Sequence, residues 1–226
     1  LSQMEFFSRK LQEFMELPPR SDIYYAIGAG LSEILPDAVI AVFSYDARSK
    51  IATGKAVFGE RVRDVISQRM GRDLVGIKIP LEIDAHLTGF LTTKVSKAYE
   101  TPRDLFSLWS QHVPADLLTG IENDLNLGKC YAVGLFSHEI LVGNVMFTLR
   151  KGQDLVIEPL INMYVRAASI ALQRHIADGA LRESEEKYRT LIEKAREGII
   201  IAQPAVRRYS DLNAPSRLAI AFQRAA

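Results

Sequence analysis

The sequence contains a single cysteine, Cys130, among 226 residues, so no disulfide can form within the chain. Such cysteine usage fits a reducing compartment, and we expect a cytoplasmic protein. No stretch reaches the roughly 18 consecutive apolar residues that a membrane-spanning helix requires. No segment resembles a secretory signal peptide. We therefore expect neither a disulfide scaffold nor a membrane segment in these residues.

A surplus of basic side chains is also missing. Lysine and arginine together number 28 and aspartate and glutamate 27, which gives a formal net charge of +1. Binding to nucleic acid depends on basic side chains gathered on one face, often with aromatic residues between them. No such cluster occurs in the first 200 residues. The charge pattern therefore predicts no nucleic-acid partner.

The common catalytic motifs are absent as well. The sequence has no G-x-x-x-x-G-K-[S/T] phosphate loop, no G-x-G-x-x-G after a strand and no H-E-x-x-H zinc motif. It also lacks the G-x-S-x-G element that presents a nucleophilic serine. We therefore predict that the chain is not an enzyme.

Apolar residues make up 48% of the chain, enough for a packed core. Apolar spacing predicts helices over residues 2–17, 21–35 (with Ser21 as N-cap), 59–70 (with Gly71 as C-cap) and 114–125, and a long helix from 154. Short apolar runs predict strands over 38–45, 51–57, 75–81, 128–136 and 139–149, the last two joined at Ser137-His138. Short helices are expected near Leu87 and over 103–112. The order predicts an α+β fold: an antiparallel sheet with terminal helices on one face and the irregular segment 72–126 on the other.

The residues after Gly179 become strongly charged. Leu181, Tyr188 and Leu191 occupy coiled-coil positions, which predicts a helical connector. Glu197-Gly198 is expected to end this helix, and Ile199–Ala202 is predicted to start a new strand.

The hairpin over residues 130–149 resembles the late hairpin of GAF domains. Gly134-Leu135 stands where that family often has Pro-Leu, and Gly143 matches its usual glycine. The resemblance implies an antiparallel sheet of six strands. It also implies N- and C-terminal helices on one face of the sheet and a small-molecule pocket on the other.

Residues 184–201 resemble the entry to a PAS domain through a charged helix, a Tyr-Arg-x-Leu step and a Gly-Ile-Ile-Ile strand start. A GAF domain leading into a PAS domain is a layout of sensor histidine kinases. Neither the phosphorylatable histidine segment nor the ATP-binding boxes of those kinases are present. The chain is thus divided into an N-terminal helix (1–18), a GAF-like sensory domain (19–178), a helical signalling linker (179–197) and a shortened PAS start with an atypical tail (198–226).

Candidate pocket residues concentrate in one stretch. Residues 99–113 combine aromatic side chains with a few polar groups, as small-molecule sites do. The same pattern describes a short helix that packs its aromatic face on the sheet. The candidates are Tyr99, Arg103, Phe106, Trp109, His112 and, from the hairpin, Cys130.

Cys130 has three interpretations. It could be a redox-sensing thiol, or it could attach a haem or bilin, because some GAF sensors carry such cofactors. It could also be a buried cysteine that packs as a small apolar side chain. His86 or His112 would be the axial ligand of a haem, although both also fit as ordinary loop residues. No pair of histidines has the helical spacing of a metal site.

Apolar residues along the long helix and the N-terminal helix predict a homodimer joined through both. In this interpretation the chain is a sensory, ligand-binding and dimerisation module that relays a signal to the PAS domain and a distal output. One alternative is a GAF-fold enzyme that reduces oxidised methionine, but that reaction needs several cysteines. Another is a dimeric spacer without a ligand.

Overall fold

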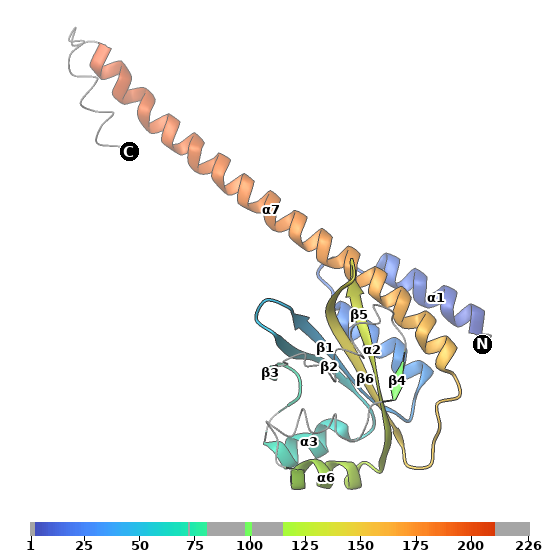
Figure 1. Cartoon of the computed structure of the whole chain (residues 1–226). Helices are drawn as coiled ribbons and strands as arrows, with labels where there is room; N and C mark the ends of the chain where they lie inside the picture. The colour runs from blue at the N-terminus through green and yellow to red at the C-terminus, as the bar shows by residue number, and fades with distance from the viewer. Residues whose placement is uncertain (1–2, 72, 81–97, 101–114, 211–226) are drawn as a thin grey trace. The chain divides into compact units, whose positions relative to one another are not determined.

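The computed structural model describes residues 3–71, 73–80, 98–100 and 115–210. It divides into two compact units, Leu1–Ile176 and Ala177–Ala226. Helix α7, Glu158–Ser210, contains the boundary between them (Figure 1). Across the described ranges, no helix is both long and apolar enough to span a bilayer.

The first unit is built on a six-stranded antiparallel sheet with the strand order β3-β2-β1-β6-β5-β4 (Figure 1). This confirms the predicted fold class and strand number. The strands are β1 (Val39–Asp46), β2 (Ile51–Phe58), β3 (Lys78–Pro80), β4 (Tyr99–Glu100), β5 (Leu127–Ser137) and β6 (Ile140–Arg150).

The β5–β6 hairpin has the two-residue turn His138-Glu139. Both residues have positive φ, 46° and 63°, as the type I′ turn that suits twisted antiparallel strands requires. The turn predicted at Ser137-His138 is wrong by one residue, because Ser137 still pairs with Ile140.

The helices predicted over 2–17, 21–35, 59–70 and 114–125 and from 154 are all present in the first unit. They are α1 (Gln3–Glu16), α2 (Ile23–Ile34), α3 (Val62–Met70), α6 (Ala115–Asp124) and the beginning of α7. The N-cap of α2 is Asp22 rather than Ser21, because the Asp22 carboxylate accepts hydrogen bonds from the amides of Tyr24 and Tyr25 at 3.0 and 3.2 Å. Gly71 ends α3 in the left-handed conformation, as predicted.

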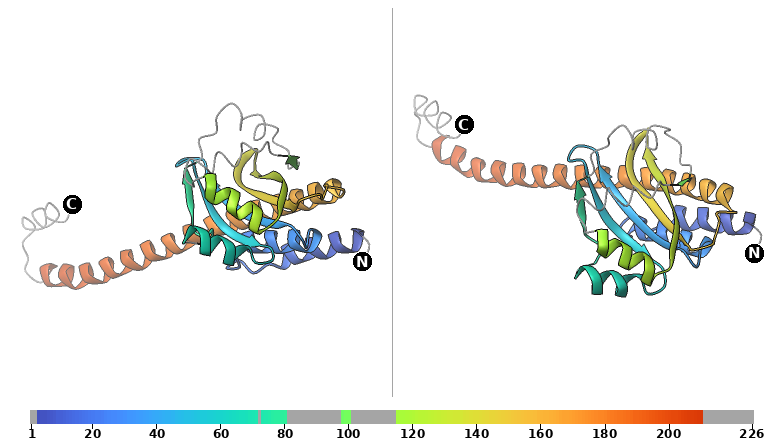
Figure 2. Two further views of the ribbon diagram at one scale, coloured as in Figure 1. Left: turned by 90° about the horizontal axis from the view of Figure 1, so that it is seen from below. Right: turned by 60° about the horizontal axis from the view of Figure 1, so that its bottom comes forward.

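Two hydrophobic clusters cover the two faces of the sheet. On one face, α2 and α7 bury a large core that includes Leu31, Phe147 and Tyr164. Helices α3 and α6 lie together against the sheet (Figure 2). On this other face they enclose a smaller cluster that includes Ile66 and Ile121. The predicted placement of the terminal helices on one face is confirmed. The short helices expected near Leu87 and over 103–112 lie outside the described residues.

The strand predicted over Ile199–Ala202 is wrong. Helix α7 continues through these residues, and through Gly179, Gly198 and Pro204, to Ser210. A helix satisfies its backbone hydrogen bonds within one segment, whereas a strand needs a neighbouring strand. No described strand pairs with residues 199–202.

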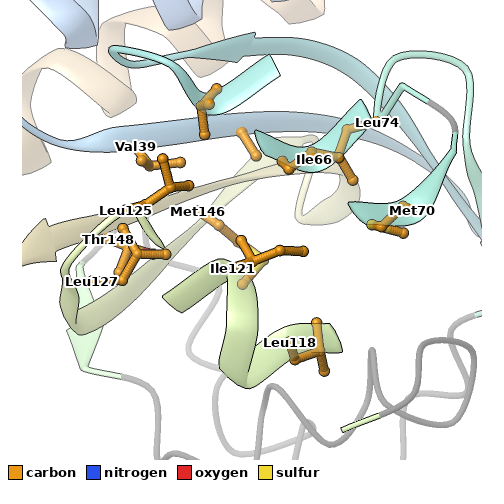
Figure 3. A pocket seen from close by; sticks show the side chains of 12 residues that line it. Val39, Ile66, Met70, Leu74, Leu118, Ile121, Leu125, Leu127, Met146 and Thr148 are labelled. Atoms are coloured by element: carbon orange, nitrogen blue, oxygen red, sulfur yellow. The ribbon is translucent and has the colours of Figure 1, made fainter. Parts of the chain in front are cut away.

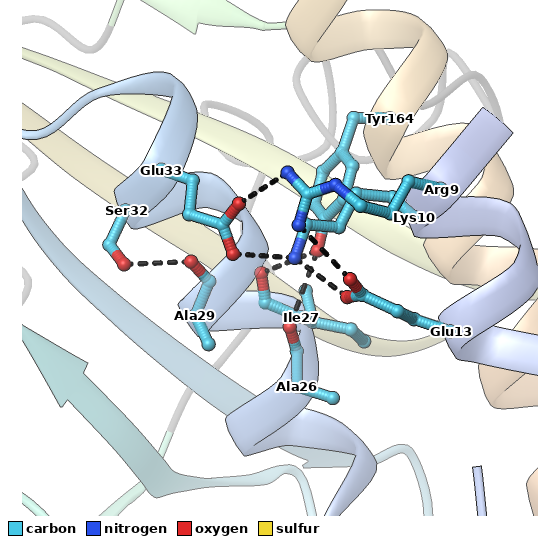
Figure 4. Close-up of polar contacts among 9 residues, drawn as sticks. All are labelled: Arg9, Lys10, Glu13, Ala26, Ile27, Ala29, Ser32, Glu33 and Tyr164. Atoms are coloured by element: carbon cyan, nitrogen blue, oxygen red, sulfur yellow. Dashed lines mark hydrogen bonds and ion pairs between the residues drawn. The ribbon is translucent and has the colours of Figure 1, made fainter. Parts of the chain in front are cut away.

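Helix α1 is held by a cluster of charged side chains. The Lys10 ammonium, with its side chain only 7% exposed, lies 2.5 Å from a Glu33 carboxylate oxygen and 2.6 Å from one of Glu13 (Figure 4). The Arg9 guanidinium donates to the other Glu33 oxygen at 2.9 Å. Since Glu33 belongs to α2, this cluster ties α1 to α2 beside the apolar contacts of Phe6 and Phe14.

We expect this attachment to weaken in acid. Burial raises the pKa of Glu33, but hydrogen bonds from Lys10 and Arg9 outweigh it and set the pKa below its ordinary value of 4.5. A carboxylate with a lowered folded-state pKa stabilises the fold above its unfolded pKa, and this contribution is lost as the pH falls through the folded pKa. Glu33→Gln should cost about 0.5–1 kcal/mol at pH 7, because the 42% exposed side chain is partly screened.

The measurement is the free energy of unfolding of wild type and Glu33→Gln across the range from neutral pH to below 4. The two curves should converge at the acidic end. Glu193→Gln on the exposed surface of α7 is the control and should follow wild type throughout. A constant difference between wild type and Glu33→Gln at every pH would contradict the assignment.

Candidate functional site

An apolar pocket of about 90 Å³ lies between the sheet and helices α3 and α6 (Figure 3). Twelve of the described side chains line it, and eleven of these are apolar. They are Val39, Ala41, Val62, Ile66, Met70, Leu74, Leu118, Ile121, Leu125, Leu127, Met146 and the one polar residue, Thr148.

The two central strands form the floor of the pocket. Val39 and Ala41 of β1 stand directly opposite Thr148 and Met146 of β6 in the antiparallel register. Side chains two residues apart share a face of a strand, so all four side chains point to the same side. Because side chains alternate between the two faces along β1 and β6, these four side chains lie together on the pocket face.

The walls come from two helices that lie far apart in the sequence. Val62, Ile66 and Met70 of α3 are spaced by four residues and share one side of that helix. Leu118 and Ile121 present the corresponding side of α6 (Figure 3). These lining residues share the side of each helix that faces the sheet, as expected for an amphipathic helix.

One ion pair joins the two walls. The Arg69 guanidinium Nε of α3 lies 2.6 Å from the Asp124 carboxylate of α6. The hydrogen bond from Arg69 lowers the pKa of Asp124, and the hydrogen bond to Asp124 raises the pKa of Arg69. Gly120 makes room for the guanidinium, since an added Cβ would lie 2.2 Å from Arg69 Nη1. The charges of the two walls thus compensate each other outside the apolar lining.

A short loop before β3 completes the wall through Leu74. The loop is fixed to β2 by two backbone hydrogen bonds: Gly54 N–H donates to Ile77 O at 2.9 Å, and Gly76 N–H donates to Gly54 O at 2.8 Å. Gly54 allows this approach, because a Cβ there would lie only 2.1 Å from the Leu74 carbonyl oxygen.

The same two central strands also form the core on the opposite face. Ile40 of β1 and Val145 and Phe147 of β6 alternate with the floor residues and pack against the terminal helices. Strands β1 and β6 therefore contribute side chains both to the pocket floor and to the core that packs against α2 and α7.

Most of the residues predicted for the pocket lie outside the described residues: Arg103, Phe106, Trp109 and His112. The same holds for the alternative haem ligand His86. The backbone of Tyr99 belongs to β4 and pairs with Ala132 of β5.

Cys130 is buried in β5, 7% exposed, opposite Thr148 in the register and so on the pocket face of the sheet. It does not line the pocket. Its burial removes the solvent access that a thiol sensor requires. The adjacent Lys129 forms an ion pair with Asp154 at 2.6 Å.

The other two histidines are not arranged as a metal site. His138 is exposed in the hairpin turn, where its Nε2 lies 2.8 Å from Gln173 Nε2, and His175 is half-buried on α7. Within the described ranges, no group of three or more His, Cys, Asp or Glu side chains is placed to hold a metal ion.

Sequence reasoning missed the residues that line the described pocket. A signal for them existed in β1 and β6, whose residues are apolar at successive positions rather than at alternate ones. Strands that are apolar on both sides are covered on both faces. The sequence thus indicated that something packs on each face, but not which helices do so.

No protein-family model and no curated protein matches the sequence. Several solved structures share the fold. The phycoerythrobilin-bound GAF domain of a cyanobacterial phytochrome superimposes with a TM-score of 0.56 at 13% identity, over 79% of this chain and 98% of that one. The GAF domain of the Acinetobacter phosphoenolpyruvate-protein phosphotransferase gives a TM-score of 0.51 at 14% identity, over 80% and 98% of the two chains.

A third similar structure is the chromophore-binding domain of a bacteriophytochrome from R. palustris, with a TM-score of 0.52 at 13% identity. It is matched over 80% of this chain and 62% of that one. At these identities the likeness establishes the fold alone. The first unit of the chain has the GAF fold.

Proposed function

We propose that the chain is a non-catalytic sensory module that binds a small molecule between its sheet and helices α3 and α6. Occupancy of the pocket is reported through the terminal helices. The observation that carries the proposal is that β1 and β6 supply both the pocket floor and the core beneath α2 and α7. Two packings of the terminal helices with different affinities for the ligand are sufficient for such a response.

The fold neighbours support a small-molecule ligand, since two of them are GAF domains bound to a phycoerythrobilin and a phycocyanobilin. The described residues do not fit a bilin. The pocket holds about 90 Å³, whereas ligand clefts measure about 300–1,000 Å³. The one cysteine available for attachment is buried outside its lining. A haem is of similar size and meets the same obstacle.

An absorption spectrum combined with a native mass spectrum of the purified, reduced protein tests this part of the proposal. We expect a colourless protein without added mass after denaturation. A Soret band, or a mass that survives denaturation, would instead identify a tetrapyrrole and make Cys130 or a histidine its point of attachment.

The relay can be tested without knowing the ligand. Ala41→Leu places three additional carbons at the pocket floor and imitates occupancy. We expect hydrogen–deuterium exchange to change in α1 and in residues 158–176 of α7, on the far face of the sheet. Ala47→Leu makes the same chemical change in an exposed turn and serves as the control. Changes confined to the neighbours of residue 41 would contradict the relay.

The onward target of the relay is a signalling domain that begins with the PAS-like sequence at 184–201. Its support is the resemblance of the charged helix and the Tyr-Arg-x-Leu step, both of which lie in helix α7, whereas the strand start of the resemblance is helical in this structure. Residues 211–226 lie outside the described part of the chain.

We also propose a homodimer formed through the terminal helices. Met163 and Ile170 of α7 are 48% and 68% exposed and seven residues apart, and Met4 and Leu11 of α1 repeat that spacing with 70% and 37% exposure. Apolar side chains at a seven-residue spacing are typical of helices that pair in coiled coils. In the second unit, the predicted coiled-coil positions Leu181, Tyr188 and Leu191 are likewise exposed.

Ile170→Glu should convert the dimer to a monomer, because a carboxylate at the centre of an apolar helix interface would be buried without a partner. Sedimentation velocity at micromolar concentration measures the change. Val156→Glu alters an 85% exposed apolar residue outside the helices and should leave the dimer intact. A wild-type protein that is monomeric at these concentrations would contradict the proposal.

The small size of the cavity favours one second candidate, a dimeric spacer whose pocket is filled by its own side chains. In that case the pocket would take up no added small molecule, and titration with xenon or 1-butanol would leave the NMR signals of its lining methyl groups unchanged.

A further inference from the structure

We infer that the pocket between the sheet and helices α3 and α6 takes a small, uncharged, apolar molecule with at most one hydrogen-bonding group, which meets the Thr148 hydroxyl. The choice of this pocket as the ligand site rests on the proposed function. The chemical class of the ligand is new.

The charges around the pocket exclude an ionic ligand. None of the twelve lining residues carries a charge. The charged side chains that join the two walls, Arg69 and Asp124, are already paired with each other at 2.6 Å. An ion moved from water into such a lining loses its hydration and gains no counter-charge, so its binding is strongly disfavoured.

Thr148 limits the polar part of the ligand. Among the described lining residues it is the one polar side chain, is 7% exposed, and projects from the floor beside Val39 (Figure 3). A threonine hydroxyl can donate one hydrogen bond and accept two, so it can satisfy a hydroxyl or a carbonyl group. Further polar groups on the ligand would lose their hydrogen bonds to water and find no partner in this lining.

The volume limits the size of the ligand. An engineered apolar cavity of about 150 Å³ in another protein stays dry and binds benzene or xenon. The present cavity is smaller, at about 90 Å³. Met70 and Met146 give it some adaptability, because the methionine side chain is unbranched and rotates about three bonds. Nucleotides and tetrapyrroles are too large and too polar for this lining, whereas short alcohols, ketones and comparable hydrocarbons match it.

The experiment follows the methyl NMR signals of the full chain during titration with xenon, 1-butanol, butyrate and butylammonium. We expect xenon and 1-butanol to shift the methyl signals of Met70 and Met146, and the two ions to leave them unchanged. Ala41→Leu should abolish both shifts by filling the floor, and Ala47→Leu should preserve them.

Thr148→Val separates the polar from the apolar part of the recognition, because valine keeps the shape of threonine and removes the hydroxyl. We expect 1-butanol to bind this variant about 2–10-fold more weakly, the usual effect of one lost hydrogen bond. Xenon should bind it as it binds wild type. An equal loss of both probes in the folded variant would overturn the role of the hydroxyl.

The ligand class is overturned if butyrate or butylammonium binds as tightly as 1-butanol, or if neither xenon nor 1-butanol shifts the lining methyl groups of the folded protein. These outcomes differ from a failure of the sensory proposal. Binding of 1-butanol with no change of hydrogen exchange in α1 and α7 supports the ligand class and contradicts the relay. A charged ligand that occupies the pocket and alters that exchange supports the relay and contradicts the ligand class.

Discussion

Replacing Tyr164 with alanine should lower the free energy of unfolding by about 3–5 kcal/mol, the range for truncating a large buried aromatic side chain. Tyr164 lies on α7 and is fully buried. Its ring centroid is 5.7 Å from that of Phe14 and 6.4 Å from that of Phe6, both on α1. One side chain thus contributes to the attachment of α1 and to the main core.

The hydroxyl of Tyr164 adds a smaller, separable contribution. It donates to the Ile27 carbonyl oxygen of α2 at 2.9 Å and lies against Gly30, where an added Cβ would be 2.1 Å from it (Figure 4). Tyr164→Phe should therefore cost only about 0.5–1.5 kcal/mol. Denaturant unfolding of both variants measures the two contributions. Equal losses for the alanine and phenylalanine variants would contradict the dominance of ring packing.

Tyr164→Ala should also release α1 before the rest of the unit unfolds. Without the Tyr164 ring, Phe6 and Phe14 lose their aromatic contact with α7. The partly exposed ion pair between Arg9 and Glu33 is worth little. Hydrogen–deuterium exchange should show faster exchange of the α1 amides in the alanine variant than in wild type, with the amides of β1 and β6 still protected.

Replacing Gly54 with alanine should have the next largest effect, a loss of about 3 kcal/mol, at the upper end of the cost of overpacking. The added Cβ would meet the Leu74 carbonyl oxygen at 2.1 Å. Because that atom belongs to the backbone, a rotamer change cannot relieve the clash. The loop must move away from β2 and lose its hydrogen bonds to Gly54. Leu74, a wall of the pocket, moves with it.

Thermal or denaturant unfolding measures this loss, and Gly179→Ala is the matched control. No atom lies within 4 Å of a Cβ added at Gly179, a helical position in α7. Alanine there should stabilise the helix by about 0.5–1 kcal/mol. The Gly54→Ala variant should also bind xenon and 1-butanol differently from wild type. Wild-type stability together with wild-type probe binding in Gly54→Ala would contradict the described approach of the loop.

The location of the proposed sensory response follows from the arrangement of the sheet. The strands that face the pocket also face the terminal helices, and the proposed relay depends on coupling between the packing on their two faces. A ligand that moves β6 by a small amount would therefore bias the packing of α7. The pocket and the dimer surface proposed for α1 and α7 lie on opposite sides of these strands.

Local patterns in the sequence were enough to predict most elements of the first unit, but not the two-residue strand β4, Tyr99–Glu100. The short apolar runs of β1 and β2, the hairpin of β5 and β6, and the helical spacing in α1 and α2 depend on the sequence within each segment. The GAF resemblance of the hairpin led to the six-stranded sheet and the placement of the terminal helices. The turn position and the N-cap were each wrong by one residue, because neighbouring polar residues satisfy the same local rules.

Only the tertiary structure decided which residues form the pocket. Its walls, Ile66 of α3 and Ile121 of α6, are brought together by the sheet on which both helices pack, and nothing local in either segment specifies that contact. The same holds for residues 199–202, where the apolar sequence suits a strand. A strand requires a neighbour to accept its hydrogen bonds, and the described chain offers none, so these residues remain in α7. The sequence by itself determined the segments and their amphipathic faces, whereas long-range packing determined which faces meet.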